Sequence, residues 1–375
     1  MTQSSQTKIN IPIVDLKSQY GLIKDEIEKA VLDVLSSGSY ILGKNVEALE
    51  EEISKYIGVN NVISCANGTD AIYLSLRALD IGYGDEVITV SHSFFATAGA
   101  ILNTGAKPVF VEIKEDDFNI DPDKIQSAIT KNTKAIIPVH IYGQPCNLDE
   151  ILQIAKRNNL YVIEDTAQAF GAKYKARFAG TLGDLGAFSF FPTKNFGAYG
   201  DAGAICTNDD NLASILRQLR VHGSPGRYIH NYIGINSRLD EIQAVILRIK
   251  LRHLEKWNNM RFQAAKRYNE LLKDIPGVII PSIKPQTSHI FHQYTIRIQN
   301  RDEVQKKMLE NGIQSIIYYP IPIHRQKAIK NLHIDFDLPI TEKISREIVS
   351  LPMYPEITLE TQKIVVEELK KAINS

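Results

Sequence analysis

Short apolar runs alternate with helical patterns between residues 62 and 207, and this alternation restricts the fold more than any other feature of the chain. Helical patterns separate most of the runs, for example at residues 71–79 and 94–103. Short buried strands joined through helices are typical of a mainly parallel sheet covered on both faces. The sequence therefore predicts an α/β fold with a mostly parallel, seven-stranded sheet flanked by helices. The expected strands lie at residues 62–66, 86–90, 107–112, 134–139, 160–164, 187–191 and 203–207.

The segments outside this alternation are mostly helical in pattern. Apolar residues at helical spacing predict helices over residues 25–37 and 45–57, with Asn45 as the N-cap and Gly58 after the end of the second helix. We expect a large domain over residues 1–245 and a small C-terminal α+β domain over residues 246–375. The elements expected after residue 237 are a long helix at 238–272, a strand at 292–298, a helix at 302–311, a proline-rich segment at 318–324 and two terminal helices.

Composition argues against several classes of function. The 375 residues carry 43 Lys and Arg against 43 Asp and Glu, so the formal net charge is zero, whereas nucleic-acid binders usually show a basic excess. The cysteines, Cys65, Cys146 and Cys206, are too few and too widely spaced for a disulfide framework or a metal site. No apolar run approaches the ~18 residues of a membrane helix, and the polar first residues lack a signal-peptide core. We expect a soluble cytoplasmic protein that binds no metal, nucleic acid or membrane.

Lys194 is the residue that most directly suggests chemistry. It follows the apolar run at 187–191 and precedes a glycine-rich turn. Apolar surroundings lower the pKa of a lysine and make its free amine available, which suits Schiff-base chemistry with a carbonyl compound. For a single lysine, a solvated position in a loop is the more common explanation. The remaining sequence has to decide between the two.

Two other positions that follow expected strands could share a cavity with Lys194. Gly68 and Thr69 join a strand to a helix, where backbone amides and a hydroxyl can bind phosphate, although taken alone a simple turn is the more common explanation. Asp165 follows the strand at 160–164, where a carboxylate can pair with the protonated ring nitrogen of pyridoxal 5′-phosphate (PLP) or cap the next turn. The carboxyl ends of parallel strands lie at one edge of a sheet, so these residues are expected in one crevice.

Further candidates have ordinary structural explanations beside the functional one. Phe94 begins a helix and could stack on a planar cofactor or simply belong to the core. Asn236 and its neighbour Ser237 have the chemistry of a helix cap. Tyr319 and His324 lie in the proline-rich segment, which could line a substrate cleft or serve only as a structural loop. The order phosphate turn, Asp165, Lys194 is nevertheless the order of parts in a PLP enzyme.

At this point the sequence resembles the DegT/DnrJ/StrS family of sugar aminotransferases, within the fold-type-I PLP enzymes. Two positions depart from the family pattern and affect fine loop geometry: Asn67, where the family often has serine, and Ala202, where it often has glycine. The resemblance runs in family order from about residue 10 to the end of the chain. The segments that carry it are residues 65–71, 84–88, 164–169, 189–195, 200–204, 236–244 and 319–324.

The resemblance implies a role for each candidate residue. Lys194 is the lysine that bonds covalently to PLP, and Asp165 holds the protonated ring nitrogen. Gln168 contacts the ring hydroxyl oxygen, and Phe94 stacks on the ring. The phosphate ligands implied by the family are Gly68, Thr69 and Ser189.

The resemblance also implies partners. Asn236 reaches the phosphate of the neighbouring subunit, so the active unit is expected to be a homodimer with shared active sites. L-glutamate is the expected amino donor, and Tyr319 and His324 are expected near a nucleotide-sugar. We favour dTDP-3-keto-6-deoxyhexose as the acceptor, giving a dTDP-3-amino-3,6-dideoxyhexose. A 4-keto sugar or a UDP-linked sugar is the alternative.

Other classes fit the sequence less well. A sugar dehydratase of the same fold would have histidine in place of Lys194. A nicotinamide dehydrogenase would need a G-x-G-x-x-G fingerprint, which the chain lacks. A non-catalytic sensor or regulator that kept the fold would have no need of the intact set of Asp165, Gln168 and Lys194.

Overall fold

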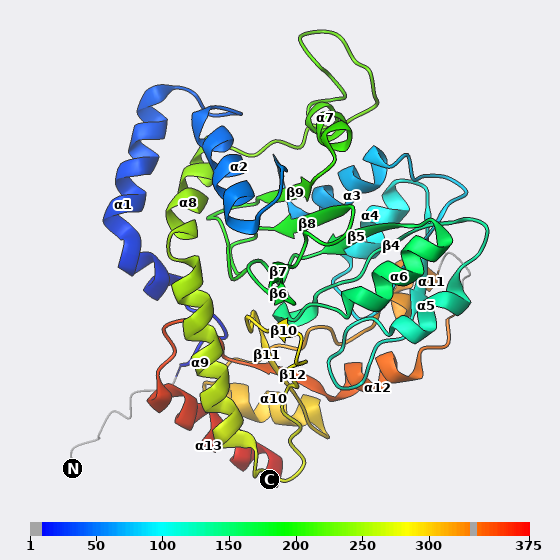
Figure 1. Ribbon diagram of the computed structural model, residues 1–375. Coiled ribbons are helices and arrows are strands. Elements are labelled where there is room, and N and C mark those ends of the chain that lie inside the picture. The colour runs from blue at the N-terminus through cyan, green and yellow to red at the C-terminus, as the bar shows by residue number, and fades with distance from the viewer. Residues whose placement is uncertain (1–9, 331–335) are drawn as a thin grey trace.

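The computed structural model describes residues 10–330 and 336–375. In this part of the chain the main sheet has seven strands in the order β1-β9-β8-β5-β4-β2-β3. Figure 1 labels its middle strands β9, β8, β5 and β4. Strand β9 runs antiparallel to both its neighbours, β1 and β8, and the other adjacent pairs are parallel. The predicted fold class, α/β with a mixed and mostly parallel sheet, is confirmed. The strands are β1 (Asn61–Cys65), β2 (Glu86–Val90), β3 (Lys107–Val111), β4 (Thr133–Ile136), β5 (Tyr161–Asp165), β8 (Leu185–Ser189) and β9 (Gly203–Thr207).

Helices cover both faces of the sheet, because successive strand residues point to opposite sides. Ile63 and Ile163 pack in one core with α3, α4 and α7. Their sequence neighbours Val62 and Val162 point the other way, Val62 toward α2 and α8 and Val162 toward α5 and α6. These helices are α2 (Lys44–Ile57), α3 (Gly68–Ala78), α4 (Ala96–Asn103), α5 (Pro122–Ala128), α6 (Leu148–Asn158), α7 (Asp210–Leu219) and α8 (Glu241–Leu251).

A second core lies in the C-terminal part of the chain, where a two-stranded antiparallel sheet of β11 and β12 packs with α9, α10 and α13 (Figure 1). Ile11, near the start of the described chain, packs into this core and pairs with Ile313. The division at residue 245 stays a prediction. The elements of this part are α9 (Leu254–Leu272), β11 (Tyr294–Arg297), α10 (Arg301–Glu310), α11 (Lys327–Lys330), α12 (Pro339–Glu347), β12 (Ile348–Leu351) and α13 (Leu359–Asn374).

The remaining elements are peripheral. Helix α1 packs on α8 through Ile23 and Ile27. A small three-stranded sheet, β10-β6-β7, lies beside the large one. Within the described ranges, no helix combines the length and apolarity needed to cross a membrane. The bounds are α1 (Leu16–Ser37), β6 (Lys173–Tyr174), β7 (Arg177–Phe178) and β10 (Thr287–Ser288).

The expected cap of α2 is wrong. Asn45 lies inside the helix, which begins one residue earlier after Gly43. Glu241 of α8 accepts hydrogen bonds from the N–H groups of Gly43, Asn45 and Val46 at 2.9, 3.0 and 2.9 Å. A carboxylate from another helix therefore satisfies the free amides that a local cap would otherwise serve. Gly58 ends the helix as predicted, with φ of 73°.

The predicted long helix at 238–272 forms two helices, α8 and α9. Arg252 and His253 separate them, with φ/ψ angles of −65°/−20° and −102°/−10°. The backbone stays near the helical region, so the two helices follow one another with a kink (Figure 1). The sequence interpretation also missed β12, which pairs with β11 between the two terminal helices α12 and α13.

Candidate active site

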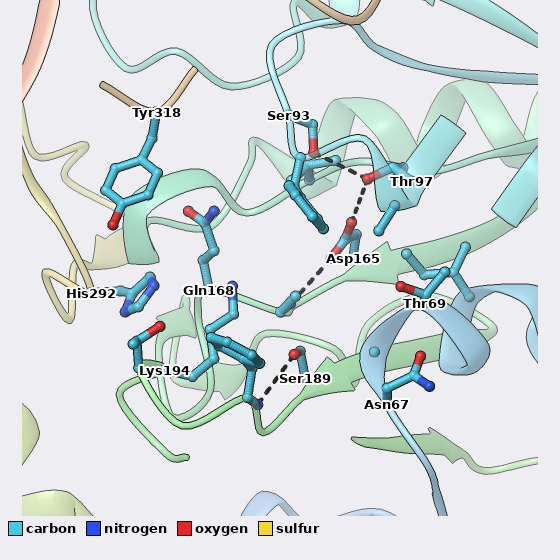
Figure 2. Close-up of a pocket in the computed structure, with 18 of the residues that line it drawn as sticks. Asn67, Thr69, Ser93, Thr97, Asp165, Gln168, Ser189, Lys194, His292 and Tyr318 are labelled. Atoms are coloured by element: carbon cyan, nitrogen blue, oxygen red, sulfur yellow. Dashed lines mark hydrogen bonds between the residues drawn. The ribbon is translucent and has the colours of Figure 1, made fainter. Parts of the chain in front are cut away.

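A cavity of about 630 Å³ lies at the carboxyl ends of the parallel strands. Its walls come from the segments that follow β1, β2, β4 and β5, from the β8–β9 connection, and from two C-terminal segments. Figure 2 shows Asn67 and Thr69 on one side, His292 and Tyr318 on the other, and Asp165, Gln168 and Lys194 between them. The polar residues of the lining are Asn67, Thr69, Asp70, Ser93, Thr97, Asp165, Gln168, Ser189, Thr193, Lys194, Asp201, His292, Gln293, Tyr318 and Tyr319.

The Gly68–Thr69 side of the cavity is built like an anion site. These residues begin α3, so their N–H groups have no acceptor within the helix and lie at the positive end of its dipole. The Asn67 side chain accepts from the N–H of Asp70 at 2.8 Å and fixes the turn. Ser189 lines the same side of the cavity. The donors suit a phosphate group.

Strand β9 supports this turn at a distance that only glycine permits. A Cβ on Gly203 would lie 2.5 Å from the carbonyl carbon and oxygen of Asn67 and 2.9 Å from the nitrogen of Gly68. A Cβ on Gly68 would lie 2.5 Å from the Cβ of Ser189. The turn therefore rests directly on two strands, which fixes its amides relative to the rest of the cavity.

Substituting Gly203 by alanine is expected to displace the turn and weaken binding of PLP to the cofactor-free protein by roughly tenfold or more, since overpacking costs ~1–3 kcal/mol. Absorbance titration with PLP measures this change. The matched control is Gly21→Ala, because a Cβ at Gly21 would meet nothing within 4 Å. Unchanged PLP affinity in the Gly203 variant would contradict the expectation.

Asp165 is a buried carboxylate at the end of β5. Its side chain is 5% exposed, and it accepts hydrogen bonds from Thr97 Oγ1 at 2.8 Å and from the N–H of Ala167 at 3.2 Å. Burial raises the pKa of Asp165, while the bonds from Thr97 and Ala167 and the charge of Lys194 act in the opposite direction. Two neutral donors orient this carboxylate, and a protonated ring nitrogen would supply the counter-charge that it lacks.

Lys194 lies on the β8–β9 connection, which is held by backbone hydrogen bonds near its own start. The N–H of Lys194 donates to the carbonyl of Phe191 at 2.8 Å, and the N–H of Ala198 donates to the carbonyl of Phe190 at 2.7 Å. Burial lowers the pKa of Lys194 from 10.5 to about 8, partly offset by the nearby Asp165. Roughly a tenth of the amine is therefore uncharged at pH 7, far more than for an ordinary lysine, and this neutral form is the one that a nucleophile or general base requires.

The lowered pKa of Lys194 predicts a stability effect in the cofactor-free protein. At pH 7 and below, the amine is mostly charged in both the folded and the unfolded chain, so folding carries nearly the full cost of burying the charge. Lys194→Met should therefore raise the free energy of unfolding at pH 7 by ~2 kcal/mol. The gap should shrink between pH 8 and 10.5, where the unfolded chain binds more protons and wild-type stability rises. Denaturant unfolding of both proteins measures this difference in the free energy of unfolding. A difference that does not change with pH would contradict the lowered pKa of Lys194.

Gln168 and an aromatic pair form the remaining wall. Gln168 Oε1 accepts from the N–H of Tyr142 at 2.7 Å, and its Nε2 donates to the Tyr319 hydroxyl at 3.2 Å, so both ends of the amide are fixed. Phe94 lies with its ring centroid 5.9 Å from that of Tyr319. Its side chain is 57% exposed, which leaves a ring face open for stacking rather than committed to the core.

Two predicted site residues do not line the cavity of this chain. His324 is 3% exposed, and its ring nitrogens contact Ser91 Oγ at 2.6 Å and Glu342 Oε1 at 3.2 Å. This placement gives no support to a sugar contact by His324. Asn236 is exposed on the segment that leads into α8, where its backbone pairs with Val221.

The capping explanation for Asn236 and Ser237 is wrong. Helix α8 begins after Asp240 and has no side-chain cap. Ser237 instead donates to Asp70 Oδ2 at 2.7 Å and accepts from the N–H of Ala66 at 3.1 Å. It thereby ties the segment of Asn236 to the phosphate-type turn at the start of α3.

Sequence reasoning missed several lining residues. Thr97 lies three residues after Phe94 in a segment that follows a strand, so the strand-end rule could have found it. His292 and Gln293 come from the C-terminal part of the chain and carry no local signal. Their buried Nδ1 and Oε1 atoms have no hydrogen-bond partner among the described residues, which leaves them free for a ligand.

The residues present fit PLP. The cavity offers helix-terminal amides for a phosphate at one side, a buried carboxylate for a ring nitrogen and a lysine with a lowered pKa for a carbonyl carbon. Gln168 adds a fixed amide donor and Phe94 an open ring face. No described group of three or more His, Cys, Asp or Glu side chains could hold a metal ion.

Comparison with known proteins identifies the family. The sequence model of the DegT/DnrJ/EryC1/StrS aminotransferase family matches residues 22–370. The chain belongs to this family. Its relatives include the "Pleiotropic regulatory protein" of Geobacillus stearothermophilus, 49% identical over 96% of this chain and 98% of that protein. The dTDP-3-amino-3,6-dideoxy-alpha-D-galactopyranose transaminase of Aneurinibacillus thermoaerophilus is 45% identical over 96% and 99%.

A further relative, UDP-N-acetyl-3-dehydro-alpha-D-glucosamine 3-aminotransferase of Acidithiobacillus ferrooxidans, is 43% identical over the full length of both chains. The solved structure of S. venezuelae DesV matches with a TM-score of 0.95 at 39% identity, covering 98% of this chain and 99% of that one. NtdA of Bacillus subtilis, solved with bound PMP (pyridoxamine phosphate), matches with a TM-score of 0.92 at 34% identity, covering 100% of this chain and 87% of that one. The DegT/DnrJ/EryC1/StrS resemblance, the PLP cofactor and the aminotransferase class are confirmed.

Proposed function

We propose that the protein transfers the amino group of L-glutamate to a nucleotide-linked keto-deoxysugar, with dTDP-3-keto-6-deoxyhexose as the preferred acceptor. The product is a dTDP-3-amino-3,6-dideoxyhexose. One observation carries the proposal: Asp165 and the lowered-pKa amine of Lys194 line the same cavity as the open amides of α3 (Figure 2). The name of the Aneurinibacillus relative, a transaminase of a dTDP-3-amino-3,6-dideoxy sugar, supports the choice of acceptor.

Bound PLP supplies an electron sink for the carbanion that forms when an amino acid loses its α-proton. In the proposed mechanism the N–H groups of Gly68 and Thr69, with Ser189, bind the phosphate. Asp165, oriented by Thr97, holds a proton on the ring nitrogen. Lys194 in its neutral form would act as the general base that takes the proton from the donor Cα and, once protonated, would give that proton back to the cofactor; for the sugar it would act in the reverse direction. Gln168 and Phe94 fix the plane of the ring.

The sugar requires its own test. The protein is incubated with L-glutamate and, in separate reactions, with dTDP-3-keto, dTDP-4-keto and UDP-3-keto sugars, and NMR of the product locates the new C–N bond. An amine at C3 of a dTDP sugar supports the proposal. An amine at C4 would overturn the C3 assignment, and turnover only with UDP sugars, such as the Acidithiobacillus relative's name describes, would overturn the nucleotide.

We also propose a homodimer with shared active sites, in which Asn236 reaches the phosphate of the neighbouring subunit. The segment before Asn236 projects from the body of the chain (Figure 1) and exposes Tyr228 and Ile233 at 95% and 86%. Helix α1 exposes Leu22 and Leu32 at 65% and 61%. These exposed apolar side chains support the proposed interface between two subunits.

Mixing two inactive variants tests the shared site. A mixed dimer of Lys194→Met and Asn236→Ala chains contains one site with both residues intact, so activity should return when the variants are refolded together. If mass measurement shows that mixed dimers have formed and activity still does not return, the shared site is contradicted.

We place the dimer in the cytoplasm, since Cys65, Cys146 and Cys206 are all unpaired in the structure.

A non-catalytic regulator is the candidate from another class, because the Geobacillus relative is named as a regulatory protein. A first half-reaction separates the two. Adding L-glutamate to the PLP-loaded protein should shift its absorbance toward that of PMP and release 2-oxoglutarate. Absence of both changes would favour the regulator.

A further inference from the structure

Lys250 of α8 is almost fully buried, which is unusual for a lysine. It is 1% exposed, and its Nζ donates to the carbonyl of Gly197. The Nζ also lies 4.9 Å from the centre of the Tyr199 ring. Burying a lysine is unfavourable unless its amine is hydrogen-bonded, so the chain retains this residue at a cost in stability.

Gly197 connects this contact to Lys194. A Cβ on Gly197 would lie 2.5 Å from the carbonyl oxygen of Pro192 and 2.6 Å from that of Phe191, so its backbone is pressed against the start of the loop. The Phe191 carbonyl accepts the N–H of Lys194 at 2.8 Å. Gly197 therefore packs directly against the carbonyl that holds the backbone of Lys194.

Two other side chains attach the same loop to the α8–α9 pair. The N–H of Tyr199 donates to Gln243 Oε1 at 2.9 Å, and Asn195 Nδ2 donates to Asn258 Oδ1 at 3.2 Å. Lys250 lies between Gln243 and Asn258 in the sequence, and of these three side chains only Lys250 can carry a charge. Burial lowers its pKa to about 7, and the nearby Arg261 acts in the same direction. Because a neutral amine still has N–H groups, the bond to Gly197 persists whether or not Lys250 is protonated.

We propose that Lys250 is a positioning residue: by holding the Gly197 carbonyl, it fixes the loop that carries Lys194 and so orients the reactive amine in the cavity. The catalytic part of this inference rests on the proposed function; the part about the loop does not. Lys250 itself does not line the cavity. It acts through the backbone alone.

The test compares Lys250→Met with Lys256→Met, a matched change at an exposed lysine on α9. Methionine keeps the length and apolar packing of lysine but cannot donate to Gly197. In the full-length PLP-loaded protein, hydrogen exchange of the Ala198 and Tyr199 amides should become roughly tenfold faster in the Lys250 variant, while amides of the central strands keep their protection. The kcat for the glutamate half-reaction should fall roughly tenfold with little change in KM, because the binding groups stay in place.

Lys250→Gln gives a second measurement if the methionine variant does not fold. Its amide can donate but is one atom shorter, so loop exchange and kcat should lie between those of wild type and the methionine variant. Wild-type exchange in the loop of a folded Lys250 variant would overturn the inference. Loss of transamination in every protein, wild type included, would count against the proposed function, and the exchange result would still decide the role of Lys250.

Discussion

Replacing Lys194 by methionine is expected to lower the rate of the glutamate half-reaction by on the order of a hundred- to ten-thousand-fold, since a general base contributes ~10²–10⁴ and no other amine of the lining can replace it. The cavity residues of the described chain include no second lysine. Lys250, another buried lysine, donates to the Gly197 carbonyl and does not line the cavity. Stopped-flow absorbance after addition of glutamate measures the rate.

The control for this change is Lys156→Met, at an exposed position on α6. It should react at the wild-type rate. A second readout is chemical: borohydride should join PLP to the peptide that contains Lys194 in wild type and leave the variant unlabelled. Labelling of another lysine, or a variant that keeps more than a tenth of the activity, would show that Lys194 does not carry the reaction.

Replacing Asp165 by asparagine is expected to lower kcat by on the order of a hundred- to a thousandfold, the usual effect of removing one electrostatic contact in a water-excluded site. The amide keeps the shape of the carboxylate but cannot hold a proton on a ring nitrogen. Thr97→Val should cost less, roughly tenfold, because it removes only one of the two donors that orient Asp165. Steady-state kinetics with glutamate and the keto-sugar gives both values.

The same substitution at Asp123, an exposed residue of α5, is the matched control and should leave kcat unchanged. The pH profile adds a distinguishing measurement. Since the carboxylate raises the pKa of the ring nitrogen that it contacts, the Asp165 variant should show the absorbance of an unprotonated ring at a lower pH than wild type does. An unshifted profile with full activity would remove Asp165 from the mechanism.

The sequence could predict which residues meet in the cavity wherever the signal was local. Gly68, Asp165 and Lys194 each follow a strand, and the edge of a parallel sheet collects such positions. The fold class followed from the same alternation of strands and helices. These predictions needed only the period of the apolar pattern and the rule that strand ends share an edge.

The features that the sequence did not reveal depend on contacts between distant segments. Glu241 caps a helix that lies almost two hundred residues earlier in the chain. His292 reaches the cavity from the C-terminal part, whereas the ring nitrogens of His324 contact Ser91 and Glu342 instead. In each case tertiary packing selects the partner, and no spacing within the local sequence encodes it.

The reversed direction of β9 has a consequence for how this site can change. Because β9 lies antiparallel beside β8, residues 190–202 form a simple hairpin connection rather than a crossover with a helix. The start of β9 therefore lies at the same edge as the end of β8, and one local hairpin supplies Ser189, Lys194 and Gly203. The reactive lysine can thus be repositioned by altering this connection alone, without rearranging the order of the strands.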